Sequence, residues 1–138
     1  MPRAAATPTQ PCGRADARVR LDQAHKFLEV AGLVAGETEI PASLSVAAAL
    51  AVLAGIAASD AACCAALGRR ARGQDHRQAL PVLAQVDGGR RASRDLGRLL
   101  DLKDTAHYGL IYVSRQKLTS ALAQAGRLVQ FAEDVLAR

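Results

Sequence analysis

The strongest constraint on the fold is an apolar run between residues 44 and 67, in which Asp60 is the only charged residue. Eleven of these residues are alanine, the best helix former. The run is long enough to cross a membrane, but alanine is only weakly hydrophobic and a carboxylate interrupts it. A helix that is apolar nearly all round belongs at the centre of a helical protein. We therefore expect a buried central helix from Ser43 to Leu67, and no membrane partner.

The remaining composition also favours helices over sheets. Half of the residues are apolar, and the aromatic ones are two Phe and two Tyr, with no Trp. Sheets prefer aromatic and β-branched residues, which are scarce here. A length of 138 residues favours one domain. The sequence predicts a disordered N-terminal tail over residues 1–15, without the apolar segment of a secretory signal, and one folded domain over residues 16–138.

Periodic apolar residues predict four further helices, over residues 16–35, 76–86, 91–102 and 114–137. Gly36 and Gly68 are expected to end helices in the left-handed conformation, and Asp75 and Ser114 are expected to cap them. Pro81 should kink or shorten the third helix. Residues 103–113 are expected to form a bend or loop. The predicted fold class is all-α, an antiparallel bundle of four to five helices.

The three cysteines, Cys12, Cys63 and Cys64, predict neither a disulfide framework nor a metal site. Their number is odd, and no further ligands follow at regular spacing. Cys63 and Cys64 are interpreted as small packing residues of the central helix. With no secretory signal expected, the predicted location is the cytoplasm.

The positive charge is concentrated in one segment. Residues 69–98 hold eight arginines and three aspartates, while the rest of the chain has ten basic and ten acidic residues. The planar guanidinium group binds phosphate through two-point contacts, which points to RNA, DNA or a nucleotide. The alternative is a solvated helix face. The candidate phosphate-binding residues are Arg69, Arg70, Arg72, His76, Arg77, Arg94 and Arg98.

Asp60 interrupts an apolar stripe that begins at Val46 and continues through Leu50, Leu53 and Ile56. A buried carboxylate needs a partner, so we expect Arg94 or Arg98 to pair with it. The alternative is a solvent-facing position. His25, on the first helix, is expected at the surface.

Three stretches together resemble the HEPN superfamily, the nucleotide-binding domains of higher eukaryotes and prokaryotes. They are LDQAHKFLEVAGLVA, AASDAACCAALGRRARGQDHRQALPVLAQV and RDLGRLLDLKDTAHYG, and the resemblance runs from Ala17 to Leu136. It implies a HEPN-like helical fold. Active members of the family resemble metal-independent ribonucleases, in which an arginine and a histidine act on the scissile phosphate, usually across a dimer interface.

In the family motif about four to six residues separate the arginine from the histidine that follows it, and this chain departs from that spacing. The nearest match is Lys103 with His107, with three residues between them and lysine in place of arginine. Arg72 and His76 have the same spacing in an earlier segment. The candidate catalytic residues are therefore His107 and Lys103, with Tyr108 as a donor to phosphate. The alternative is that Lys103 and His107 merely end a helix, where its dipole favours cations.

The degenerate motif predicts a nuclease-inactive HEPN-like domain that binds RNA, a nucleotide or a protein partner as a homodimer. One alternative is an active, toxin-type, metal-independent endoribonuclease that uses His107 and Lys103. The other is a purely structural assembly module. No phosphate-binding glycine loop, zinc spacing or nucleophile elbow occurs in the sequence, so no cofactor and no metal are expected.

Overall fold

The computed structural model describes residues 7–37, 39–73 and 75–138, and the described chain is almost entirely helical. The all-α expectation is therefore confirmed. The elements are β1 (Thr9–Pro11), α1 (Arg14–Ala35), α2 (Pro41–Leu67), β2 (Arg69–Ala71), the 3₁₀ turn η1 (His76–Gln78), α3 (Ala79–Leu83), α4 (Gly89–Tyr108) and α5 (Arg115–Leu136).

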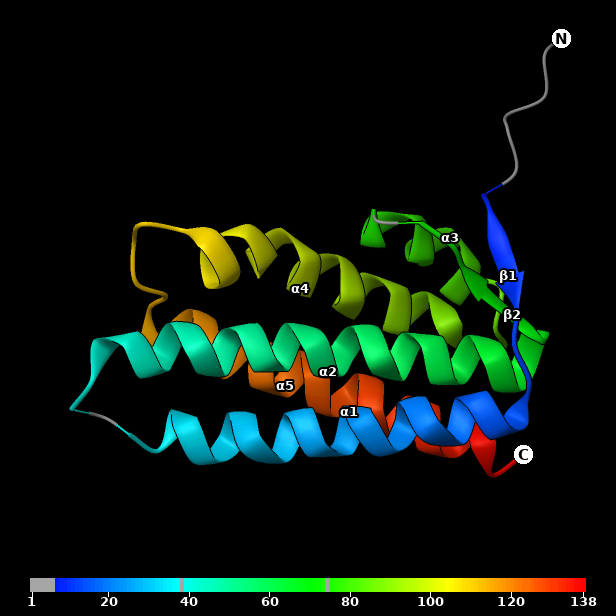
Figure 1. The fold of residues 1–138 in the computed structure, drawn as a ribbon, viewed down its shortest axis with the longest axis horizontal. Helices are drawn as coiled ribbons and strands as arrows, with labels where there is room; N and C mark the ends of the chain where they lie inside the picture. Colours follow the sequence, from blue (N-terminus) through cyan, green and yellow to red (C-terminus); the bar gives the residue numbers. More distant parts are fainter. Residues whose placement is uncertain (1–6, 38, 74) are drawn as a thin grey trace, which may run out of the picture.

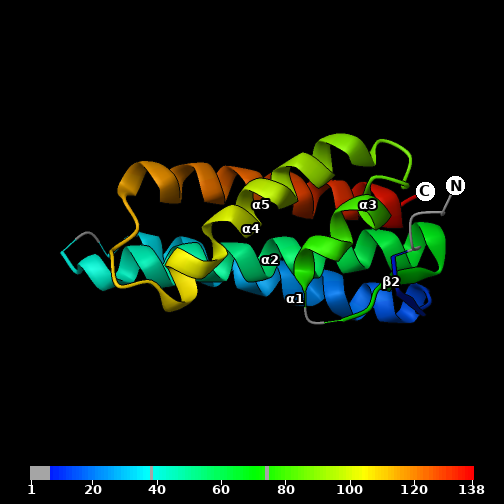
Figure 2. The same cartoon turned by 90° about the horizontal axis from the view of Figure 1, so that it is seen from above.

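Four long helices lie side by side along one axis, and the short α3 lies near one end (Figures 1 and 2). The central helix is α2, which contacts α1, α4 and α5. The alanines let these neighbours approach closely, and Gly55 marks the tightest place. A Cβ atom there would lie 2.5 Å from Leu99 Cδ1 of α4 and 3.1 Å from Leu128 Cδ1 of α5.

By length and composition alone α2 is long and apolar enough to cross a membrane, but most of it lies inside the protein. Its buried residues extend from Ser43 to Cys64. The side of α2 that bears Val46, Leu50 and Leu53 is less buried than the sequence predicted. Val46 is 49% exposed and the two leucines are half-buried, while Ile56 is buried. The stripe exists, but most of it faces away from the core because α1 and α4 do not close over it.

The expected tail contains ordered structure. Residues 9–11 form β1 and pair antiparallel with residues 69–71 of β2, and α1 begins at Arg14 instead of residue 16. The prediction of a disordered tail is therefore wrong for residues 7–15, while residues 1–6 lie outside the described residues. Composition could not reveal the partner strand, because that strand lies about 60 residues away in the arginine-rich segment.

Cys12 and Cys64 form a disulfide, which contradicts the prediction. The β1–β2 ladder brings Cys12 beside the end of α2, where its backbone N–H donates to the Gly68 carbonyl at 3.1 Å. The Cα atoms of the two cysteines are then 5.1 Å apart, which is a normal spacing for the bond. Cys63 is free and buried, as expected for a packing residue, and burial raises the pKa of its thiol to about 12.

The helix ends follow the predicted caps in part. Asp75 accepts a hydrogen bond from the Arg77 backbone at 3.0 Å, and Ser114 accepts one from Lys117 at 3.2 Å. Gly68 is left-handed with φ of 70°, but Gly36 ends α1 in the right-handed helical region. In place of one helix over residues 76–86, η1 and the five-residue α3 are present, and the chain leaves the helix soon after Pro81.

The fourth helix is longer than expected, because α4 continues through residues 103–108 before the Gly109 break. The weak helix formers Thr105, His107 and Tyr108 are overruled by packing of Leu102 and Ala106 against a second group of buried residues near Val113 and Leu118. Asp95 of α4 is a buried carboxylate, only 8% exposed. It accepts hydrogen bonds at 3.0 and 2.8 Å from Arg127 of α5, so the pair ties α4 to α5.

Candidate functional site

Asp60 lies at the centre of an ion cluster on the outer side of α2. Its Oδ2 atom accepts from Arg20 Nε of α1 and from Arg70 Nη1 of β2, each at 3.0 Å. The expected partner type is therefore present, but Arg94 and Arg98 are the wrong residues. Both lie on α4 at other surfaces, whereas Asp60 lies between α1 and the start of the 69–86 segment.

The β1–β2 ladder holds Arg70 in this position. Arg70 pairs with Gln10 in the ladder, and Arg72 N donates to the Pro8 carbonyl at 2.9 Å. With the Gln10 amide oxygen turned toward the guanidinium group, it accepts from Arg70 Nη2 at 2.8 Å and from Nε at 2.7 Å. The Gln10 side chain and one carboxylate thus fix the direction of the Arg70 side chain.

His76 lies next to this ion cluster, at the first position of η1. It lines a small cavity of about 30 Å³ together with Asp60, Asp75, Ile56 and Leu96. Burial lowers the pKa of His76 below its usual value of 6.5, and the charge of Lys103 lowers it further, against the opposing effects of Asp60 and Asp75. His76 is therefore mainly neutral at pH 7, and one of its ring nitrogens can accept a proton.

Lys103 comes from α4 and is half-buried. Among the described residues, no carboxylate lies within ion-pair distance of it. The fold thus brings together two residues that the sequence analysis placed in separate sites, His76 and Lys103. We refer to Arg20, Asp60, Arg70, His76 and Lys103 as the His76 cluster.

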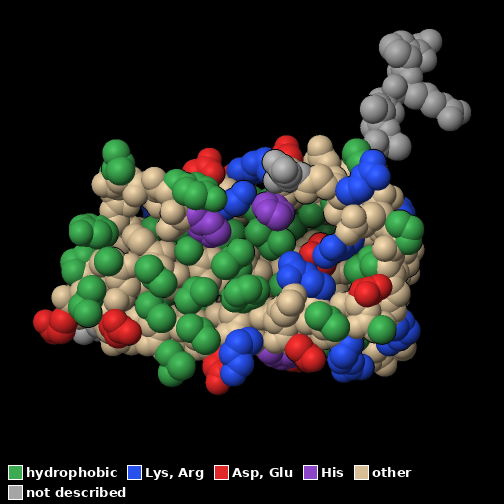
Figure 3. Space-filling view, viewed as in Figure 1, with side chains coloured by type: hydrophobic (Ala, Val, Ile, Leu, Met, Phe, Trp, Pro, Cys, Tyr) green, Lys and Arg blue, Asp and Glu red, His purple; other side chains and the backbone are tan. Residues whose placement is uncertain are grey.

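His107 follows Lys103 by four residues on α4 and lies on the same side of the helix. Its Nε2 atom is 3.4 Å from the Ala49 carbonyl oxygen of α2, and its ring meets that of Tyr108 edge-on at 5.8 Å. Tyr108 is 77% exposed at the end of the helix. On the face shown in Figure 3, histidines lie near Lys and Arg side chains along the upper part of the molecule.

The other predicted phosphate-binding residues lie apart from one another. Arg69 bonds to Gln85, and Arg77 pairs with Asp101 at 2.6 Å, which ties η1 to α4. Arg72 is exposed on the strand segment. Arg94 lines a surface pocket at the start of α4 together with Arg90 and Arg91. The arginine-rich segment therefore contributes to several separate surfaces. Of its predicted phosphate-binding residues, only Arg70 and His76 belong to the His76 cluster.

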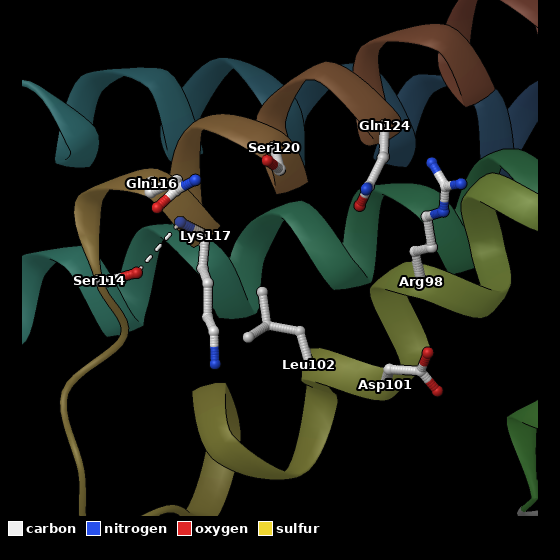
Figure 4. A pocket seen from close by; sticks show the side chains of 8 residues that line it. All are labelled: Arg98, Asp101, Leu102, Ser114, Gln116, Lys117, Ser120 and Gln124. Atoms are coloured by element: carbon white, nitrogen blue, oxygen red, sulfur yellow. Dashed lines mark hydrogen bonds between the residues drawn. The ribbon is translucent and has the colours of Figure 1, made fainter.

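Arg98 lines a different hollow of about 490 Å³ between α4 and α5. Figure 4 shows its guanidinium group near Gln124, while Lys117 extends from α5 toward Leu102, well away from Arg98. The two cations do not converge on one point. This hollow offers polar side chains without a focused charge, so we take the His76 cluster as the candidate site.

Sequence reasoning missed Arg20 entirely and did not count Asp60 as a site residue. Asp60 had a visible signal, because it interrupts an apolar stripe. Arg20 had none, since it is one of several arginines at the start of α1 and its role depends on the packing of α1 against α2. Gln10 was hidden because it lies in the segment expected to be disordered.

The His76 cluster combines a mainly neutral histidine with two arginines that are paired with Asp60 and one lysine that has no such partner among the described residues. Arg20 and Arg70 are engaged by Asp60, whereas Lys103 has no carboxylate within ion-pair distance among the described residues. A cavity of about 30 Å³ holds a water molecule or one ligand atom, not a whole nucleotide. A larger ligand would therefore lie over the cluster at the surface.

The chain matches no model of a known protein family and no curated protein.

Proposed function

We propose that this protein is a HEPN-like helical bundle that binds a phosphate-bearing ligand, a nucleotide or RNA, over the His76 cluster. One observation carries the proposal. Lys103, a half-buried cation with no carboxylate partner among the described residues, lies two residues after Asp101 of α4, which pairs with Arg77 of η1 at 2.6 Å, and its charge lowers the pKa of neighbouring His76. A phosphate would neutralise Lys103 and accept a hydrogen bond from His76, whose pKa should then rise.

The surrounding charge supports the same ligand class. Arg72 and Arg77 are exposed on the segment that carries His76, and Arg77 also pairs with Asp101 of α4. Exposed arginines raise the local concentration of polyanions through long-range attraction, which salt weakens. The order of long and short helices, with a break before α3, supports the HEPN-like interpretation.

A binding titration tests the proposal. Fluorescently labelled RNA and a nucleotide should bind with an affinity that falls as salt rises, and Lys103→Met should weaken binding about tenfold or more, equivalent to about 1.4 kcal/mol. Lys117→Met, which removes an exposed lysine from α5, is the matched control and should change the affinity less than twofold. Salt-independent binding, or equal losses in the two variants, would contradict the proposal.

A second candidate function is RNA cleavage without a metal, and the lowered pKa of His76 favours it. Neutral His76 would take the proton of the 2′-hydroxyl, whose oxygen would attack phosphorus. The 5′-oxygen would leave with a proton from a second group, for which we propose the predicted catalytic residue His107, and Lys103 would stabilise the phosphorane charge. The products would be a 2′,3′-cyclic phosphate and a 5′-hydroxyl.

Cleavage is tested by incubating labelled RNA with the protein and EDTA. If the chain is a nuclease, the cyclic product accumulates, and His76→Ala abolishes it while His25→Ala does not. RNA that binds but stays intact would support the binding function and contradict the catalytic one.

The location in the cell is a separate question. We propose that α2 is the core helix of a soluble protein. Disulfides persist mainly in oxidising compartments, so the Cys12–Cys64 bond argues against the cytoplasmic expectation. Thiol counting on rapidly alkylated cells decides the matter, because a reducing compartment yields three free thiols and an oxidising one yields Cys63 alone.

A further inference from the structure

The Cys12–Cys64 disulfide borders a hollow at the end of the molecule where β1 lies. Both cysteines line this hollow of about 500 Å³, together with Asp16, Arg20 and Arg70. Cys64 is buried, whereas Cys12 is half-buried, so an incoming thiol would reach the Cys12 sulfur first. Access is one of the properties that decide how readily a disulfide exchanges with a thiol. A small dithiol can therefore reach this bond while the helices stay folded.

The bond is the strongest attachment of β1 to the rest of the molecule. The β1–β2 ladder has three residue pairs, and Pro11 in one of them has no N–H to donate. A pair of strands this short is not stable by itself in water. Among the described residues β1 packs mainly against β2, and Figure 1 shows both strands at the right-hand edge of the molecule. Without the covalent bond, the ladder is expected to open.

Release of this segment would stop at α1. Ala17, in the first turn of α1, is fully buried, and the Arg14 side chain donates to the carbonyl oxygen of Leu136. These contacts hold the start of α1 independently of the disulfide. The part of the described chain that depends on the bond is therefore residues 7–12.

The same segment supports one wall of the cavity beside His76. Thr9 pairs with Ala71 in the ladder, and Ala71 lines that cavity of about 30 Å³. The wall on the side of the long helices is formed by Ile56 of α2 and Leu96 of α4, which do not depend on β1. Movement of Ala71 would therefore open the cavity on one side and admit water to the histidine ring.

Two further contacts from this segment anchor the strand that leads to His76. With its amide oxygen turned toward Arg70, Gln10 accepts from that guanidinium group. The Pro8 carbonyl oxygen accepts from Arg72 N at 2.9 Å. Loss of these acceptors gives the chain between β2 and η1 more freedom, so the state of the disulfide is linked to the order of the His76 cluster.

We propose that the Cys12–Cys64 disulfide is a redox switch: a dithiol reduces it, residues 7–12 leave β2, and the cavity beside His76 opens. A thiolate of the dithiol attacks the Cys12 sulfur, the S–S bond breaks, and Cys64 leaves as a thiolate that takes up the proton released by the attacking thiol. The second thiol of the dithiol then loses its proton and attacks the mixed disulfide. This step releases Cys12, which takes up that proton, and oxidises the dithiol to a cyclic disulfide, so two electrons and two protons pass to the protein.

NMR on the full chain tests the release. Dithiothreitol should speed hydrogen exchange of the Cys12 and Arg72 backbone N–H groups about tenfold or more, because both bonds join this segment to residues 68–72. It should also move the pKa of His76 up toward 6.5, because the ring becomes less buried. Circular dichroism should show that the helices remain. Cys12→Ser should have these properties without reductant and should not respond to it, whereas Cys63→Ala keeps the bond and should respond like the wild type.

Ser114→Ala is the control for general destabilisation. It removes the cap of α5 at the opposite end of the molecule and should leave the exchange of both N–H groups and the pKa of His76 unchanged. Unchanged exchange and pKa in the fully reduced wild type would overturn the proposal. Loss of the helical signal together with the ladder would also overturn it, because the change would then be global unfolding.

The switch does not depend on a ligand, and only its effect on affinity rests on the proposed function. Labelled RNA should bind the reduced chain about threefold or more weakly than the oxidised chain, since the His76 cluster is less ordered. Equal affinity in the two states would overturn the link between the disulfide and the His76 cluster. RNA that binds in neither state would contradict the proposed function alone, because hydrogen exchange and the pKa of His76 decide the switch without RNA.

Discussion

Asp60 shows how one carboxylate can hold three segments of the chain together. It lies on α2, and its side chain accepts from an arginine of α1 and an arginine of β2. The side chain of Asp60 is 15% exposed, so the interaction is shielded from water and salt more than a surface pair. Removing the acceptor leaves two guanidinium groups close together with no charge between them.

We expect Asp60→Asn to lower the free energy of unfolding by roughly 1.5–3 kcal/mol, because hydrogen bonds to charged groups contribute about that amount. Urea unfolding followed by circular dichroism measures the change. Asp101→Asn breaks the exposed pair with Arg77 and should cost about 0–1 kcal/mol. Equal losses of unfolding free energy in the two variants would contradict the larger contribution expected of the shielded Asp60 carboxylate.

His76 makes stability depend on pH. Because its folded-state pKa is below the unfolded value, the unfolded chain binds more protons in the interval between the two values. Stability should therefore fall as the pH is lowered through 6.5 toward the folded-state pKa, and His76→Gln should flatten this part of the profile. An NMR titration of the His76 ring should also show a higher pKa in Lys103→Met than in the wild type. An unchanged pKa in this variant would contradict an effect of the Lys103 charge on His76.

At this scale the sequence revealed residue types better than partners. It indicated that an arginine would bind Asp60, because a shielded carboxylate requires a cation. It could not choose among fifteen arginines, since the choice depends on how α1 and β2 pack. Likewise, His76 and Lys103 are 27 residues apart in sequence, and no spacing rule joins them.

At the scale of the elements, the β1–β2 ladder with its disulfide is the part least visible in the sequence. Each strand has only three residues, and neither shows an alternating pattern of apolar and polar residues. By contrast, α1, α2 and α5 were predictable to within two residues at each end, because long apolar periodicities and Ser114 mark them. The extension of α4 to Tyr108 depends on tertiary contacts.

The disulfide should contribute strongly to stability, because it closes a loop with a sequence separation of 52 residues. We expect Cys12→Ser to lower the free energy of unfolding by roughly 2–4 kcal/mol, mainly by freeing the unfolded chain. Chemical denaturation with and without a dithiol reductant measures this. Reductant should destabilise the wild-type chain and leave Cys12→Ser unaffected, and a wild-type chain indifferent to reductant would contradict the bond's contribution.

At the scale of the whole molecule, close packing of α2 against α4 and α5 depends on the missing side chain of Gly55. Gly55→Ala should destabilise the protein by about 1–3 kcal/mol, because the added methyl group must displace Leu99 and Leu128. Thermal unfolding with calorimetry gives the value. Gly126→Ala on α5 meets nothing within 4 Å and should stabilise by about 0.5–1 kcal/mol through helix propensity alone.

The molecule also joins its first helix to its last. Arg14 Nη2 donates to the carbonyl oxygen of Leu136 at 2.5 Å, so the opening turn of α1 is fastened to the closing turn of α5. During synthesis on the ribosome, α1 emerges more than a hundred residues before its acceptor exists. The growing polypeptide therefore cannot close this contact until residue 136 has left the exit tunnel, and α1 must wait for α5 before the fold is complete.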